Sequence, residues 1–165
     1  MKRTRPRRRR SPIPHPHLYA TQIGHVFHSW LRDRPVGRAE RSWLDAALAL
    51  ALEHAILLHG PDAHESHAMT LAVVGRAAEQ IWIRTDGAPR WAALDVEAAV
   101  DRWAPHGDAL FVDTVVWTLA AFVRWLADTA VLTADEVLPL DRQLDPYLHA
   151  AMRSIVVGPV EHAVN

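Results

Sequence analysis

The apolar residues of this chain recur three and four positions apart over much of its length, and this spacing constrains the fold most. The first such run is typical of the one-sided stripe of an amphipathic helix and consists of Ile23, Val26, Phe27, Trp30 and Leu31. No stretch shows strand alternation between turn residues, and the two β-like runs, 81–83 and 156–157, are short. The spacing therefore predicts an all-α fold.

Glycine, proline and capping residues divide this pattern into about six helices. The second helix is predicted over 38–59, where Gly60 and Pro61 stop it, and its apolar middle, 46–52, is expected at the centre of the bundle. A third helix is expected to begin near Asp62 or Glu65 and to continue through Ile81. Later helices are expected to begin at Asp95, at Asp108 (running over 109–128), at the capping box Thr133 to Glu136, and at Asp145-Pro146.

The chain is expected to form one helical bundle domain over 18–165, preceded by a basic arm over 1–17. The segment 85–91 contains Asp-Gly and Ala-Pro and is expected to be a loop, and it is the best candidate for a seam within the domain. Pro12, Pro14 and Pro16 favour an extended backbone, so the arm is expected to be disordered unless a partner holds it.

Charge is distributed unevenly between the arm and the rest of the chain. Seven of the 18 basic residues, and no acidic residue, lie in the first ten positions: Lys2, Arg3, Arg5, Arg7, Arg8, Arg9 and Arg10. The remaining residues carry 11 basic against 19 acidic side chains, a balance of −8. Because arginine pairs with phosphate in bidentate fashion, the arm is expected to follow a nucleic-acid backbone without reading its sequence.

Other interpretations of the arm stay open. It could be a solvated tail, it could dock on the acidic body of the protein or on an acidic neighbour, or the start codon could have been placed too early. Lys2 is the only lysine in the chain, which fits an arginine-biased reading frame.

The 11 histidines raise the possibility of a metal site. His59, His64 and His67 lie close together in the sequence with Asp62 and Glu65, a density of nitrogen and oxygen atoms that suits a transition metal. The segment is not HExxH and the chain has no Glu-x-x-His pair, and histidines near helix ends are more often caps than ligands. We therefore expect no metal and no cofactor. His25 and His28 form a second such pair.

Seven tryptophans are many for this length. Four of them fall in helical stripes and are expected in the core: Trp30, Trp43, Trp117 and Trp125. The other three flank the loops between residues 85 and 105 and are the candidates for a partner-binding surface, with core packing as the more frequent alternative: Trp82, Trp91 and Trp103.

Composition and motifs narrow the function classes further. The chain has no cysteine, no glycine-rich nucleotide loop and no nucleophile elbow, so no catalytic residue is predicted. Its most apolar stretches, 43–58 and 110–126, fall short of the roughly 20 residues that a bilayer span needs, and residues 11–16 are not the apolar core of a secretion signal. We expect a cytoplasmic protein.

Asp113 and Arg124, about 16 Å apart along one helix, are each expected to find a partner on another helix or to face solvent.

Residues 91–105 and 119–126, in particular Trp91, Trp103 and the run Leu119-Ala-Ala-Phe122-Val-Arg124-Trp125-Leu, carry a resemblance. They resemble a module in uncharacterised proteins of high-GC bacteria, with His106-Gly107 where that module has a basic pair. The resemblance implies an all-helical fold and carries no activity and no functional residue.

Together these features predict a non-enzymatic small helical subunit or adaptor of a larger assembly, whose arm contacts nucleic acid and whose body meets a protein partner. A pure protein-interaction module is the alternative. A metal-dependent enzyme built on His59, His64 and His67 is the third possibility.

Overall fold

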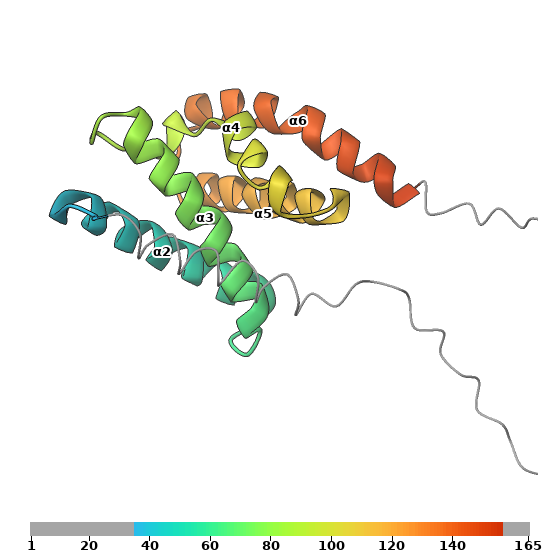
Figure 1. Ribbon diagram of the computed structural model, residues 1–165, viewed down its shortest axis with the longest axis horizontal. Helices are drawn as coiled ribbons and strands as arrows, with labels where there is room; N and C mark the ends of the chain where they lie inside the picture. The colour runs from blue at the N-terminus through green and yellow to red at the C-terminus, as the bar shows by residue number, and fades with distance from the viewer. Residues whose placement is uncertain (1–34, 157–165) are drawn as a thin grey trace, which may run out of the picture.

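The structure, a computed structural model, describes residues 35–156, and within this range every regular element is helical (Figure 1). The all-α prediction is thereby confirmed for this range, with five helices rather than about six. The arm and the expected first helix lie outside the described residues. The helices, labelled as in Figure 1, are α2 (Arg38–His59), α3 (His64–Arg84), α4 (Val96–Asp101), α5 (Ala109–Asp128) and α6 (Ala134–Val156), with 3-10 turns at Trp91–Ala93 and Ala104–His106.

Helices α2 and α3 form a hairpin that turns at Gly60. This glycine has a φ of 84°, a conformation that favours glycine because it has no Cβ. Its N–H donates to the carbonyl of Ile56 at 2.8 Å, which closes α2 where the sequence predicted its end. The Nε2 of His67 then donates to the Gly60 carbonyl oxygen at 2.8 Å, which ties the start of α3 to this turn.

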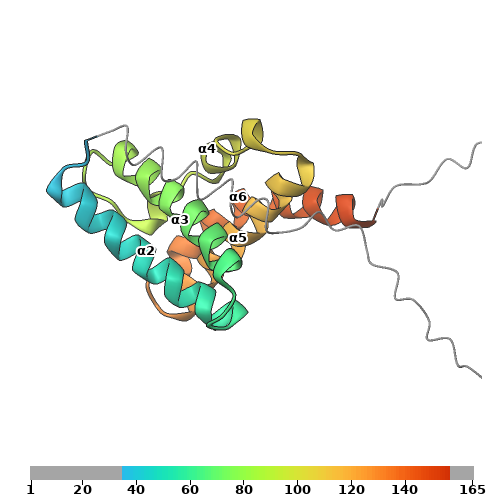
Figure 2. The same ribbon diagram turned by 60° about the horizontal axis from the view of Figure 1, so that its bottom comes forward.

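Helix α2 is not the centre of the bundle, and that expectation was wrong. Figure 2 shows α2 along one side of the molecule with α3 beside it. Small residues, mainly Ala47, Ala51 and Ala55, form its buried face and permit a close approach to α3. The larger apolar side chains of its C-terminal half point elsewhere and are exposed: Leu52, Ile56, Leu57 and Leu58.

The central helix is α5, which contacts each of the other described helices. Its apolar stripe is fully buried and consists of Phe111, Val115, Val116, Leu119, Phe122, Val123 and Leu126. Helix α5 has 20 residues and a mean hydropathy of 1.6 over an 18-residue window, so by length and composition it could cross a membrane, although the sequence was expected to fall short. The core helix of a folded domain meets the same criteria, so this finding is weak evidence for a span.

Helix α6 runs unbroken from Ala134 to Val156, and the helix expected to begin at Asp145-Pro146 is part of it. Pro139 and Pro146 lie inside this helix. The prediction failed because the apolar stripe of α6 continues past both prolines and packs against α5, and its buried members are Val137, Leu140, Leu144 and Ala151. This burial offsets the backbone hydrogen bonds that proline cannot make.

The predicted caps at Asp95 and Asp108 are confirmed, and the predicted capping box at Thr133 is confirmed in part. Asp95 accepts from the N–H of Ala98 at 3.0 Å, and Asp108 accepts from the N–H of Phe111 at 2.9 Å. At Thr133, the Glu136 carboxylate accepts from the backbone N–H at 2.9 Å and from the hydroxyl at 3.0 Å. The capping box is thus present in its glutamate half, with the hydroxyl donating to the carboxylate.

Aromatic rings join α2 to α5 in the core. The centroid of Phe122 lies 5.1 Å from that of Trp91 and 5.7 Å from that of His54. Trp43 packs 5.2 Å from Trp91, and its indole N–H donates to the carbonyl of Ala78 at 2.7 Å. Trp125 stacks on Phe122 at 5.9 Å, so residues from three elements form one cluster.

Two polar residues of α5 find partners on α6, as expected. The side chain of Arg124 lies 3.6 Å from Asp141, and Ser154 donates to Asp113 at 2.5 Å. Both contacts involve exposed groups, so they orient the two helices more than they stabilise them.

Candidate functional site

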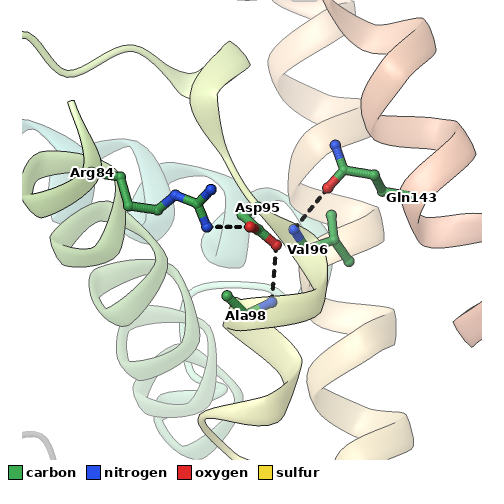
Figure 3. A network of polar contacts seen from close by, with 5 residues as sticks. All are labelled: Arg84, Asp95, Val96, Ala98 and Gln143. Atoms are coloured by element: carbon green, nitrogen blue, oxygen red, sulfur yellow. Dashed lines mark hydrogen bonds and ion pairs between the residues drawn. The ribbon is translucent and has the colours of Figure 1, made fainter.

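The short helix α4 is held against its neighbours by a network at its N-terminus (Figure 3). The Asp95 carboxylate caps α4 with one oxygen and pairs with the guanidinium of Arg84, on α3, through the other. The side-chain oxygen of Gln143, on α6, accepts from the N–H of Val96 at 3.0 Å. Since this N–H belongs to the first turn of α4, the bond satisfies a donor that the helix itself cannot.

A pocket of about 240 Å³ lies between α3 and α4, next to this network. Three arginines line it: Arg76 and Arg84 from α3 and Arg102 from the end of α4. Positions 76 and 84 are two turns apart and so lie on one face of α3. The other lining residues are Glu79, Gln80, Ile83, Ala98 and Ala99.

The charged groups of this pocket differ in burial. Arg76 is only 11% exposed and Glu79 only 4%, and their side chains form an ion pair at 3.0 Å. Burial lowers the pKa of Arg76, Glu79 raises it, and the positive charge of Arg102 lowers it. Arg84 is about half exposed and Arg102 is exposed, so the arginine side of the pocket is open to solvent.

This arrangement suits binding more than catalysis. Guanidinium groups donate hydrogen bonds and keep their charge, so they hold oxyanions. Glu79 is committed to Arg76, and the lining includes no serine, threonine or histidine. The pocket therefore offers positive charge and hydrogen-bond donors but no nucleophile.

The three tryptophans proposed as a partner surface differ in burial. Trp91 and Trp103 are 6% and 2% exposed and belong to the core, which corrects their assignment as partner-binding residues. Trp91 packs in the aromatic cluster, whereas Trp103 packs 6.0 Å from Phe111. Trp82 is half-buried beside Gly87. Among residues 35–156 the exposed tryptophan is instead Trp117, which was expected in the core and is 41% exposed.

The histidines proposed for metal binding are not brought together as ligands. Among residues 35–156, no group of three or more His, Asp or Glu side chains could hold a metal ion. His67 is buried and bonded to Gly60, while His59 and His64 are exposed. The rings of His64 and His67 meet edge to face at 6.0 Å. His67 thus serves the turn between α2 and α3.

The seven basic residues of the arm, and the pair His25 and His28, lie outside the described residues.

The arginine pocket itself was missed in the sequence. A signal did exist, since Arg76 and Arg84 recur eight residues apart in the mainly apolar C-terminal part of this helix. The third arginine, Arg102, joins them only through the packing of α4 on α3.

No protein-family model, no curated protein and no solved structure matches this chain.

Proposed function

We propose that this protein is a non-enzymatic helical adaptor whose N-terminal arm contacts the phosphate backbone of nucleic acid without sequence preference. The observation that supports it is the separation of charge. The first ten residues carry seven basic side chains and no acidic one, whereas residues 35–156 carry nine arginines against 17 acidic side chains, a balance of −8.

The acidic body makes the arm the contact point. A net charge of −8 repels a polyanion, so the body contributes no general attraction to DNA or RNA. Seven cations can neutralise up to seven phosphates, and each neutralised phosphate adds about 0.9 to the slope of log K against log salt on duplex DNA. We therefore expect a slope of up to about −6.

The body is proposed to meet a protein partner through the C-terminal half of α2. Leu57 and Leu58 are 68% and 55% exposed there, and the neighbouring Leu52 and Ile56 are each 39% exposed. Exposed acidic side chains, Glu53 and Asp62, border this apolar surface. A partner with an apolar patch bordered by basic residues would complement it.

Fluorescence anisotropy with a labelled DNA duplex and a labelled RNA strand tests the arm. Replacing Arg7, Arg8, Arg9 and Arg10 with glutamine should reduce affinity at least tenfold at 100 mM salt and flatten the salt slope by about 4. The matched control replaces the same four residues with lysine, keeps the charge, and should retain most of the affinity. Undiminished binding by the glutamine variant would rule out the arm as the contact, and no binding by the intact chain would overturn the proposal in favour of a pure protein-interaction module.

The α2 surface is tested separately, by comparing proteins that co-purify with the intact chain and with two variants. Leu57→Glu should lose a defined partner, whereas Leu138→Glu, at a 53% exposed position on α6, should keep it. Equal recovery with both variants would place the partner elsewhere.

A further inference from the structure

The pocket between α3 and α4 holds its arginines in place before any ligand arrives. Glu79 fixes Arg76 through a buried ion pair at 3.0 Å, and Asp95 fixes Arg84 while also capping α4. Long side chains lose conformational freedom when they bind a ligand, and two of these three have already lost it. The pocket is therefore preorganised for an anion.

The pocket also carries an excess of positive charge. Three arginines line it, and two carboxylates pair with them, Glu79 with Arg76 and Asp95 with Arg84, which leaves the charge of Arg102 in excess. Glu97 and Asp101, the other acidic residues of α4, do not line the pocket. Like charges that converge in a partly desolvated cavity repel, and an entering anion relieves that repulsion.

The shape of the pocket limits the size of the anion. A cavity of about 240 Å³ has room for a few non-hydrogen atoms beyond one carboxylate or phosphate group, and it is too small for a nucleic-acid strand. Ile83, Ala98 and Ala99 supply apolar contacts beside the guanidinium groups. This combination suits a short hydrocarbon part attached to an oxyanion.

We propose that this pocket binds a small organic oxyanion, a carboxylate or a phosphate ester, through Arg76, Arg84 and Arg102. The inference concerns a site in the body of the protein and is independent of the function proposed for the arm. Arg102 is the group best placed to close on the ligand, because it is exposed at the end of α4 and forms no ion pair with another residue of the range 35–156.

The test is a titration of the full chain followed by backbone amide NMR, with inorganic phosphate in one series and butyrate in the other, at constant ionic strength set with sodium chloride. Signals of Ala98, Ala99 and Arg102 should shift and saturate at millimolar concentrations of at least one anion. The chain with glutamine at Arg7, Arg8, Arg9 and Arg10 should give the same shifts, which separates binding in this pocket from binding by the arm. Saturation with phosphate alone or with butyrate alone identifies the preferred head group, and saturation with neither overturns the proposal.

Two variants and a control assign the binding to this pocket. Arg102→Gln should weaken the apparent affinity about tenfold, the typical effect of losing one charged hydrogen bond. Ala98→Leu leaves the charge unchanged and fills the pocket, so it should abolish saturation. Arg142→Gln, at an exposed position on α6 away from the pocket, should bind like the unmodified chain. Equal affinity in Arg102→Gln and Arg142→Gln would overturn the proposal, even if Ala98→Leu failed to fold.

Discussion

At the scale of single residues, Trp43 joins α2 to α3 through one hydrogen bond, to Ala78, and contacts the ring of Trp91 in the core. Replacing Trp43 with phenylalanine keeps a ring near Trp91 but removes the indole donor to Ala78. We expect a loss of about 1–2 kcal/mol in the free energy of unfolding, measured by urea denaturation. The control is Trp117→Phe, at an exposed position, which should change stability by less than about 0.5 kcal/mol.

His54 gives the core a dependence on pH. Its ring packs against Phe122 and Trp125, and burial, followed by the charge of His59, lowers its pKa from the ordinary value of 6.5. The unfolded chain therefore takes up a proton at higher pH than the folded one. The contribution of neutral His54 to the free energy of unfolding is fully present above about pH 6.5. It decreases as the pH drops from there towards the lowered pKa of the folded state.

Replacing His54 with phenylalanine removes this titration and keeps the aromatic contact. Urea denaturation between pH 7.5 and 5 should show a smaller loss of stability on acidification than in the unmodified chain. His149→Gln, at an exposed position, should retain the full loss. Parallel curves for the unmodified chain and the phenylalanine variant would show that another group is responsible.

Gly107 is required because the Phe111 side chain lies close to its Cα. Its backbone angles are ordinary extended ones that any residue can adopt. A Cβ at this position would overlap the Phe111 side chain, coming within 2.6 Å of its Cβ, and Phe111 is 2% exposed. Gly107→Ala should therefore cost about 1–3 kcal/mol, the usual effect of overpacking, in a thermal or urea denaturation experiment. At Gly37 a Cβ meets nothing within 4 Å, so Gly37→Ala should cost only about 0.5 kcal/mol as a poorer N-cap.

At the scale of elements, α6 is the helix whose sequence is least favourable for helix formation, because it contains two interior prolines. Pro146 lies in its interior, is exposed, and has no N–H for the carbonyl of Arg142. Pro146→Ala should raise the free energy of unfolding by about 2 kcal/mol, since an interior proline costs about 3 kcal/mol and stiffening of the unfolded chain returns about 1. Pro105→Ala, in the first turn of a 3-10 helix, should give no gain.

The boundaries of elements were easier to predict than their placement. Gly60, Asp95 and Asp108 act locally, through one backbone angle or one side-chain hydrogen bond, so the sequence predicts the ends they set. The position of α2 depends on which of its apolar faces meets α3, and a helix that is apolar all round does not specify this. The alanine face is buried because it allows the closest approach.

The same distinction applies to the candidate site. Two arginines on one face of α3 are visible in the sequence as an interruption of an apolar pattern. Their meeting with Arg102 depends on the angle at which α4 docks, which the contacts of Asp95 and Gln143 determine. Tryptophans near loops were assigned to a surface because loops are usually exposed, yet Trp91 and Trp103 fill the space beneath the loops.

At the scale of the whole molecule, opposite charges are placed at different parts of one chain. The net charge of the full chain is −1, and without its first ten residues it is −8. We expect the full chain to associate with itself at low ionic strength, arm to body, and to separate at about 0.5 M salt, where charges are screened beyond a few ångströms. Light scattering across a salt series measures this, and a chain lacking residues 1–10 should remain monomeric throughout.

The arrangement of the body as two hairpins has a kinetic consequence. Helices α2 and α3 are neighbours in sequence and in space, and so are α5 and α6, so most contacts between helices join segments that are close along the chain. Chains with such local contacts close short loops first and fold in microseconds to milliseconds. We therefore expect the two hairpins to form early and the contacts among the rings of His54, Trp91 and Phe122, which join the two halves, to form late.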